Sequence, residues 1–183
     1  GCRTLRGQME RRERFEALYR AHAGAVRGYA LRRTGAAAAD DVVAEVFLVA
    51  WRRLDDVPSD PLPWLLGAGR RVLANRRRGD DRQAALRDKL IAETASRPPF
   101  EGPSWDHDDR VLRALAGLGP EDREALLLVA WEGLTPARAA RALEVRPGTF
   151  AMRLHRARRR LARVLAAGDP VVRPDPERSE VLQ

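Results

Sequence analysis

Apolar side chains recur every three or four residues along most of the chain, with polar side chains between them. The first such stretch forms one face at helical spacing, made of Phe15, Leu18, Tyr19, His22, Val26 and Tyr29. Thr34-Gly35 ends this predicted helix, and a second is predicted to begin at Asp40 and Asp41, since acidic residues suit a first turn. Pro63 fits the first turn of a third helix that starts near Trp64.

The second half of the chain carries stronger start and stop signals. A helix is predicted from about Arg110, and Pro120 opens another, which Gly133 ends. Thr135-Pro136 is a capping residue followed by a first-turn proline, and Pro147 opens the last long helix. Hydrophobic residues make up 44% of the chain but aromatic residues only 5%, so the core must be built from Leu, Val and Ala, which suits helical packing. The predicted fold class is all-α.

The change of character in mid-chain predicts two small helical domains. The first covers residues 10–87 and the second 110–167, with a flexible tail at 168–183. Residues 88–109 contain several prolines and six acids against two bases, which indicates a flexible acidic linker. A solvated loop with no role is the alternative for this segment.

Composition narrows the possible functions further. The formal net charge is +8, the isoelectric point is near 11.0, and Lys89 is the only lysine among the bases. Guanidinium groups suit phosphate contacts, although a GC-rich genome also raises arginine content. Cys2 is the only cysteine, and no Cys/His set has metal-ligand spacing, so no disulfide within the chain, metal or cofactor is expected. No apolar run approaches a membrane span or signal peptide, and the expected location is the cytoplasm.

Residues 134–163, LTPARAARALEVRPGTFAMRLHRARRRLAR, predict a helix-turn-helix. A short helix with small residues at Ala139 and Ala140 is separated from the next helix by the four-residue turn 144–147. Phe150 and Leu154 are expected in the core. No acid occurs between Glu144 and Asp169, so the arginines of the last helix are unopposed, which favours DNA binding over a merely solvated face.

A second basic cluster is expected on the third helix. It contains seven arginines, at positions 70, 71, 76, 77, 78, 82 and 87, close to Trp64 and Asn75. Arginine combined with an aromatic ring and an amide can hold single-stranded nucleic acid by stacking and backbone contacts. A tryptophan in this setting is more often a core residue, so a core position is the favoured alternative for Trp64.

Three segments resemble the extracytoplasmic-function (ECF) sigma factors of the sigma-70 family. ADDVVAEVFLVAWRRL (39–54) is similar to sigma region two, and WLLGAGRRVLANRRR (64–78) to the helix that melts and reads the minus-ten promoter element. Residues 113–161 are similar to region four, most specifically in the PGT-x3-RLHRAR segment. The resemblance covers about residues 12–165.

The resemblance implies a role for particular residues. It implies contact with the clamp of the polymerase β′ subunit for Asp41, Glu45, Phe47 and Trp51. The two aromatic residues, Phe47 and Trp51, could equally be core residues. It implies minus-ten binding for Trp64, Arg70, Arg71, Asn75, Arg76 and Arg77. It implies minus-thirty-five binding in the major groove for Arg146, Thr149, Met152, Arg153, His155, Arg156 and Arg159. Arg156 is the best candidate for a base contact, since arginine pairs bidentately with guanine.

The resemblance also implies the partners: the core RNA polymerase, through its β′ clamp and β flap, promoter DNA, and an anti-sigma factor. Several positions depart from the family pattern. Ala44 stands in place of glutamine, Arg138 and Ala139 in place of Glu-Ile, and Glu144 in place of a turn glycine. Phe150 stands in place of valine, and Ala151 and Met152 are less polar than usual. A non-glycine residue at Glu144 would be strained if that turn needs positive φ.

Other classes of function remain as alternatives. An autonomous helix-turn-helix repressor would bind a palindromic site as a dimer, but no dimerisation seam at heptad spacing is evident. An enzyme is disfavoured because no nucleophile, phosphate loop or metal set accompanies the scattered histidines and paired acids. A regulated interaction partner without promoter activity is the third alternative.

Overall fold

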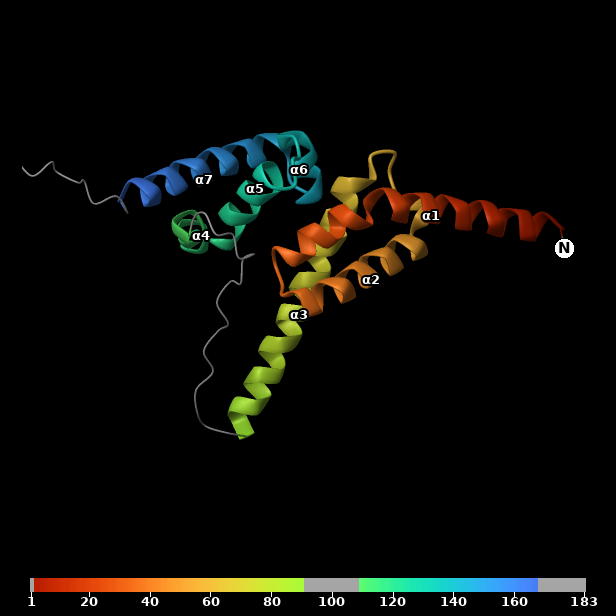
Figure 1. The fold of residues 1–183 in the computed structure, drawn as a ribbon, viewed down its shortest axis with the longest axis horizontal. Helices are drawn as coiled ribbons and strands as arrows, with labels where there is room; N and C mark the ends of the chain where they lie inside the picture. Colours follow the sequence, from red (N-terminus) through yellow and green to blue (C-terminus); the bar gives the residue numbers. More distant parts are fainter. Residues whose placement is uncertain (1, 91–108, 168–183) are drawn as a thin grey trace, which may run out of the picture.

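The computed structural model describes residues 2–90 and 109–167, which form α-helices, one 3-10 turn and no strand (Figure 1). Helices α1 (Cys2–Leu31), α2 (Ala36–Arg52) and α3 (Pro61–Leu90) pack on one another as a first domain. Helices α4 (Asp109–Ala116), α5 (Pro120–Ala130), α6 (Pro136–Ala142) and α7 (Pro147–Ala167) form a second domain. The expected all-α, two-domain fold is therefore confirmed.

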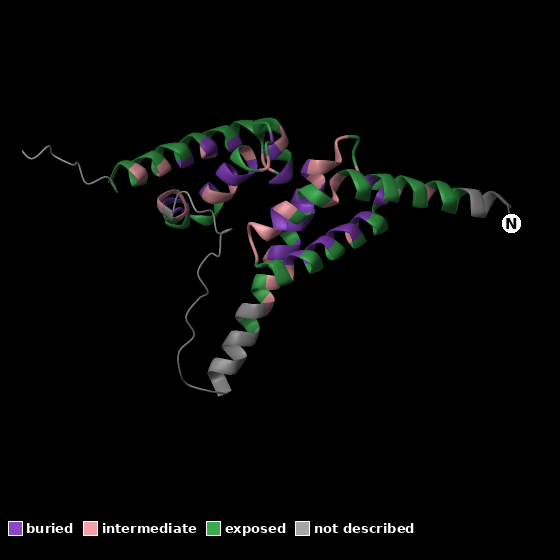
Figure 2. Cartoon of the chain, viewed as in Figure 1, coloured by how far each residue is buried: buried purple, intermediate pink, exposed green. Residues whose placement is uncertain are grey.

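The core of the first domain is formed by one apolar face of each of its three helices. Helix α2 buries Ala39, Val42, Val43, Val46, Phe47 and Ala50, the spacing of a single helical face. Helix α3 buries Leu65, Leu66, Val72 and Leu73 against it. Helix α1 contributes Leu18, Val26 and Tyr29, while its N-terminal part extends past α2 (Figures 1 and 2).

The start of α2 differs from the sequence-based expectation. The helix begins at Ala36 and not at Asp40, so both acids lie in its second turn. Ala36 to Ala39 have the highest intrinsic helix propensity of any residue, which is enough to extend the helix by one turn. The 3-10 turn Leu54–Asp56 follows α2, and α3 then starts at Pro61 with Pro63 in its first turn.

The predicted signals of the second domain are confirmed. Gly119 caps α5 with Pro120 in its first turn, and Gly133 has a φ of 64°, which favours glycine. The hydroxyl of Thr135 accepts a hydrogen bond from the amide of Arg138 (3.3 Å) at the start of α6. These capping residues define where α5 and α6 begin.

The two domains contact each other directly, mainly through α3 and α6, and their buried apolar residues form one connected cluster. The sequence analysis did not predict this contact. Of the expected linker 88–109, residues 88–90 are helical in α3 and residue 109 begins α4. Residues 91–108 and the expected tail, 168–183, lie outside the described part of the chain.

Candidate nucleic-acid interface

Helices α6 and α7 form the predicted helix-turn-helix. Within the turn, the amide of Glu144 donates to the carbonyl of Arg141 (3.1 Å), and that of Val145 to Ala140 (3.0 Å). Glu144 has a φ of 56°, and it is the only non-glycine residue with positive φ among the described residues. The turn therefore has the geometry that glycine prefers, and a glutamate there costs roughly 1 kcal/mol of strain.

One side of α7 is buried and the rest is available to a ligand. Phe150, Leu154 and Ala157 are buried at a spacing of four and three residues. The remaining faces carry five of the predicted minus-thirty-five residues, all exposed: Thr149, Met152, His155, Arg156 and Arg159. Arg146, also exposed, lies in the turn directly before the helix, so these six lie on or next to one helix, as expected for an element that enters the major groove.

Two arginines of α7 are instead tied to α5. The guanidinium of Arg153 lies 2.9 Å from the carboxylate of Glu121 and its side chain is only 19% exposed. Arg160 donates to Asp122, which is buried at the start of α5. Both contacts orient α7 on its own domain, so Arg153 has a structural partner that the sequence did not predict.

The predicted minus-ten residues divide between two faces of α3. Arg70, Asn75 and Arg77 are exposed to solvent, and the side-chain oxygen of Asn75 accepts from Arg78. Trp64 is half-buried, and both it and the exposed Arg71 line the cleft against the second domain. The predicted set is therefore not one continuous open surface in this structure.

Arg76 joins two predicted surfaces. It donates to Glu45 through two nitrogens, one at 3.0 Å, and lies 3.5 Å from Asp41 on α2. The hydrogen bond with Glu45 is the main cause that raises the pKa of Arg76. Arg76, a predicted minus-ten residue, therefore pairs with Asp41 and Glu45, two predicted clamp-binding residues that are both exposed.

The aromatic clamp candidates differ in exposure. Phe47 is 3% exposed and its ring packs against Tyr19 at a centroid distance of 4.7 Å, so it is a core residue. Trp51 is 38% exposed, its ring lies 5.2 Å from that of Phe15, and Arg11 sits over it at 5.3 Å. Of the two, only Trp51 presents its ring at the surface.

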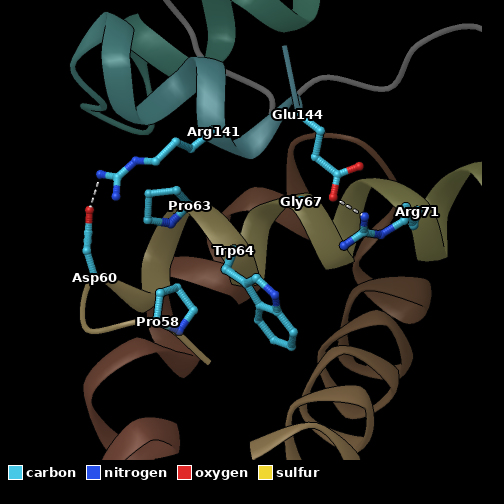
Figure 3. Close-up of a pocket in the computed structure, with 8 residues that line it drawn as sticks. All are labelled: Pro58, Asp60, Pro63, Trp64, Gly67, Arg71, Arg141 and Glu144. Carbon is cyan, nitrogen blue, oxygen red and sulfur yellow. Dashed lines mark hydrogen bonds and ion pairs between the residues drawn. The ribbon is translucent and has the colours of Figure 1, made fainter. Parts of the chain in front are cut away.

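A cleft of about 180 Å³ lies between α3 and the helix-turn-helix (Figure 3). Trp64, Gly67 and Arg71 line it from one side, with an ion pair between Arg71 and Glu144 across it. At its edge Asp60 accepts from two second-domain arginines in α6, at 3.0 and 2.7 Å from Arg138 and 2.5 Å from Arg141. The hydrogen bonds from Arg138 are the main cause that lowers the pKa of Asp60.

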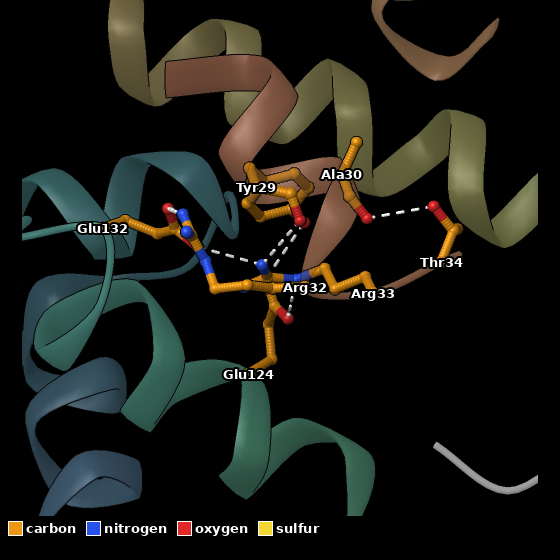
Figure 4. Close-up of polar contacts among 7 residues, drawn as sticks. All are labelled: Tyr29, Ala30, Arg32, Arg33, Thr34, Glu124 and Glu132. Atoms are coloured by element: carbon orange, nitrogen blue, oxygen red, sulfur yellow. Dashed lines mark hydrogen bonds and ion pairs between the residues drawn. The ribbon is translucent and has the colours of Figure 1, made fainter. Parts of the chain in front are cut away.

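A second polar contact between the domains lies at the end of α1 (Figure 4). Arg33 is 2.9 Å from both Glu124 and Glu132, and Arg32 pairs with Glu132. The hydroxyl of Tyr29 donates to Glu124 (3.0 Å), and the guanidinium of Arg33 stacks 3.6 Å from the Tyr29 ring. The side chains of Arg33 and Glu132 are each 4% exposed, so this is a buried, charge-balanced group.

Burial raises the pKa of the Tyr29 hydroxyl, and the charge of Glu124 raises it further. Burial alone would lower the pKa of Arg33, but Glu124, Tyr29 and Glu132 together raise the pKa by more, so the guanidinium remains charged. We call Tyr29, Arg32, Arg33, Glu124 and Glu132 the buried ion cluster. The sequence analysis placed Tyr29 on an apolar helix face but did not predict any of these polar contacts. The sequence signal is an Arg-Arg pair directly after an amphipathic helix, and nothing in it identifies glutamates 91 to 100 residues away.

Among the described residues, no group of three or more His, Cys, Asp or Glu side chains is arranged to hold a metal ion. None of the helices in residues 2–90 and 109–167 combines the length and apolarity needed to cross a bilayer.

Fold and site together define a two-domain helical protein with a helix-turn-helix of the DNA-binding type. Comparison with known families then gives the particular group. Residues 18–83 match the family described as Sigma-70 region 2, and residues 108–161 match Sigma-70, region 4. The chain belongs to the ECF sigma factors of the sigma-70 family, a family of transcription initiation factors.

Individual relatives agree with this assignment. The ECF RNA polymerase sigma factor SigL of Mycobacterium tuberculosis is 34% identical over 156 residues, which cover 80% of this chain and 86% of SigL. The sigma factor NccH of Alcaligenes xylosoxydans is 32% identical over 69% of this chain and 72% of its own.

Solved structures give the same result for the fold. The sigma factor RpoE of Bartonella quintana, in complex with the anti-sigma factor NepR, matches with a TM-score of 0.64 and 25% identity, over 85% of this chain and 98% of its own. CnrH, in complex with the cytosolic domain of CnrY, matches with a TM-score of 0.55 and 26% identity, over 85% of this chain and 89% of CnrH.

Proposed function

We propose that this protein is an ECF-type sigma factor that binds core RNA polymerase and directs initiation at promoters with specific minus-ten and minus-thirty-five elements. One observation carries the proposal. The chain matches both sigma-70 regions, and in the second of them α7 presents exposed arginines, with no acid in the helix to oppose them. Such a surface binds duplex phosphates while a few side chains read base edges.

The proposed division of labour follows the two domains. Residues 10–87 bind the β′ clamp and open the minus-ten element, residues 88–109 link the domains, and residues 110–167 hold the minus-thirty-five element and the β flap. The polymerase contacts on the first domain are Asp41, Glu45 and Trp51, because Phe47 is buried. In the second domain Arg156 is the base-reading residue, and Arg146 and Arg159 hold phosphates.

Regulation by an anti-sigma factor is part of the proposal. Two solved relatives that cover 85% of this chain, RpoE and CnrH, were each determined bound to a partner, which for RpoE is the anti-sigma factor NepR. The protein acts in the cytoplasm, where the polymerase and the chromosome are, and breaks no covalent bond itself. Catalysis belongs to the polymerase that it directs.

The test is run-off transcription with purified core polymerase on a library of genomic promoter fragments. The expected result is specific start sites that require this protein and disappear when it is omitted. Gel filtration with core polymerase should show a stable complex. A protein that ignores core polymerase, and instead binds a symmetric duplex tightly as a dimer, would be an autonomous helix-turn-helix regulator, and the proposal would be wrong.

A further inference from the structure

Thr149, Arg153, Arg156 and Arg160 form one stripe along α7. They are spaced by four, three and four residues, which places them in a row on one side of the helix. Thr149 and Arg156 are exposed, whereas the side chain of Arg153 is only 19% exposed. The stripe therefore runs along the border between the buried face of α7 and the surface predicted to enter the major groove.

Carboxylates of α5 divide the three arginines of the stripe into two kinds. Helices α5 and α7 lie side by side (Figure 1), and Glu121 and Asp122 occupy the first turn of α5. Glu121 pairs with Arg153 at 2.9 Å, and Asp122 pairs with Arg160. Arg156 stands between these two arginines and forms no ion pair with any described residue. One guanidinium of the stripe is therefore left free for a ligand.

The two ion pairs differ in their exposure to solvent. The side chain of Asp122 is 11% exposed, so its pair with Arg160 is part of the packing between α5 and α7. The side chain of Glu121 is 66% exposed, and an ion pair with an exposed partner contributes little to stability. The buried face of α7 and the Asp122 pair already dock the helix on its domain. The contact between Glu121 and Arg153 is therefore not needed for docking.

The Glu121 carboxylate instead determines where the Arg153 guanidinium lies. Thr149 and Arg156 are the neighbours of Arg153 on the stripe, and the long arginine side chain has enough rotatable bonds to turn from α5 toward them. While the carboxylate is present, it opposes the attraction between this guanidinium and a phosphate. Without it, Arg153 would be free to neutralise one more phosphate of a bound duplex and release its counterion.

We propose that Glu121 is a positioning residue of the DNA-binding surface. Its carboxylate holds Arg153 against α5 and keeps it from binding DNA, so that Arg156 is the arginine of the stripe that contacts the duplex. The proposal rests on the proposed function only for duplex DNA as the ligand. Because phosphate contacts fix the register of a protein on the duplex, Glu121 thereby limits the ways in which α7 docks.

The test is a double-mutant cycle on the full chain. It compares wild type, Glu121→Gln, Arg153→Gln and the variant that carries both substitutions. Glutamine keeps the size of glutamate and removes only its charge. Asp56→Asn is the matched control for net charge, because it removes one carboxylate from an exposed ion pair within the first domain.

Two measurements are made on all five proteins. Fluorescence anisotropy gives the affinity for a labelled mixed-sequence duplex over a series of salt concentrations from about 50 to 200 mM, a range in which phosphate contacts are strongly weakened. Thermal denaturation gives the stability of each protein, which a merely structural contact would change.

We expect Glu121→Gln to bind the duplex several-fold more tightly at low salt than the Asp56→Asn control. One more neutralised phosphate steepens the slope of log affinity against log salt by about 0.9, so this gain should shrink about 3.5-fold across the salt range. In the Arg153→Gln background, the same substitution of Glu121 should leave the slope unchanged. Thermal stability should be close to that of wild type in every variant.

Two results would overturn the proposal. The first is an unchanged slope for Glu121→Gln, which together with a loss of thermal stability would make the ion pair structural only. The second is an equal steepening with and without Arg153, which would mean that the lost charge acts on DNA directly. Failure of the proposed function is recognised separately, as absence of run-off transcription with core polymerase and the wild-type protein.

Discussion

Gly67 of α3 and Ala142 of α6 touch backbone to backbone across the domain contact. A Cβ at position 67 would stand 2.9 Å from the Ala142 carbonyl oxygen, closer than side-chain carbons approach such an atom. The oxygen belongs to the main chain and cannot rotate away, so any larger residue at position 67 must move α6.

Replacement of Gly67 by alanine is therefore expected to loosen the domain contact. Backbone amides of residues 137–142 should exchange with deuterium faster than in wild type. Gly79→Ala is the matched control, since it lies on the same helix with no atom within 4 Å of its added Cβ. In a helix interior alanine is favoured over glycine by roughly 0.5–1 kcal/mol, so the control should be slightly stabilised. Unchanged exchange in α6 would contradict the expectation.

The buried ion cluster should make the two domains unfold together. Arg33→Met leaves Glu124 and Glu132 without their main buried partner, a loss of roughly 3–5 kcal/mol for a broken buried pair. Because the domains can relieve this by separating, we expect one urea transition in wild type and two in the variant. Arg27→Met removes an exposed pair with Asp40, and it should shift the free energy of unfolding by less than about 1 kcal/mol.

Tyr29 predicts a dependence of stability on alkaline pH. Its pKa is raised in the folded chain, whereas in the unfolded chain it ionises near 10.0. A group with a raised folded pKa adds stability that is fully present below the unfolded value and is lost as pH rises above it. The urea midpoint of wild type should therefore fall more steeply from pH 9 to 11 than that of Tyr29→Phe. Parallel curves would show that Tyr29 does not contribute.

Arg156 is expected to read a base. Its guanidinium is exposed on α7 and forms no ion pair with any described residue, so Arg156→Ala should preserve the fold. Loss of a bidentate guanine contact costs about 1–3 kcal/mol and relaxes specificity at one base pair. Arg163→Ala, further along the same helix, should at most weaken binding uniformly over all sequences. Competition binding on a randomised duplex library distinguishes the two, and identical sequence profiles for wild type and Arg156→Ala would exclude the assignment.

The two apolar side chains near the start of α7 should differ sharply in their effect on stability. Phe150 is fully buried, and Phe150→Ala should lower the free energy of unfolding of the protein by roughly 3–5 kcal/mol. Met152 is 62% exposed, so Met152→Ala should stay within about 0.5 kcal/mol of wild type. Thermal and urea denaturation measure both, and a large loss for Met152→Ala would place its side chain in the core instead.

Local signals in the sequence predicted the helices of the second domain well. Thr135, Pro136 and Gly133 act through their own backbone neighbours, so their effect can be read from a few adjacent residues. The positive φ of Glu144 was also foreseen as a condition of the turn. The predicted start of α2 at Asp40 is wrong, because the four alanines before the two acids are themselves helical.

Contacts between distant segments were beyond the sequence alone. The sequence is consistent with either a surface or a core position for Phe47. Phe47 is a core residue because its ring packs against those of Phe15 and Tyr19, which belong to another helix. Arg33 and Glu124 are 91 residues apart, and periodicity carries no information on such a pair. For the same reason, two of the arginine-cluster residues, Arg71 and Arg76, were expected to be available to DNA although carboxylates bind them.

The charges of the buried ion cluster balance only when both halves of the chain are present. Arg32 and Arg33 come from the first half, and Glu124 and Glu132 from the second. The two domains therefore cannot be exchanged independently of each other, even between relatives that contain the same two sigma regions. A chimera that joins this first half to a second half without both glutamates would leave buried arginines unmatched, so successful exchange of promoter specificity between such proteins requires that these four side chains be transplanted as a set.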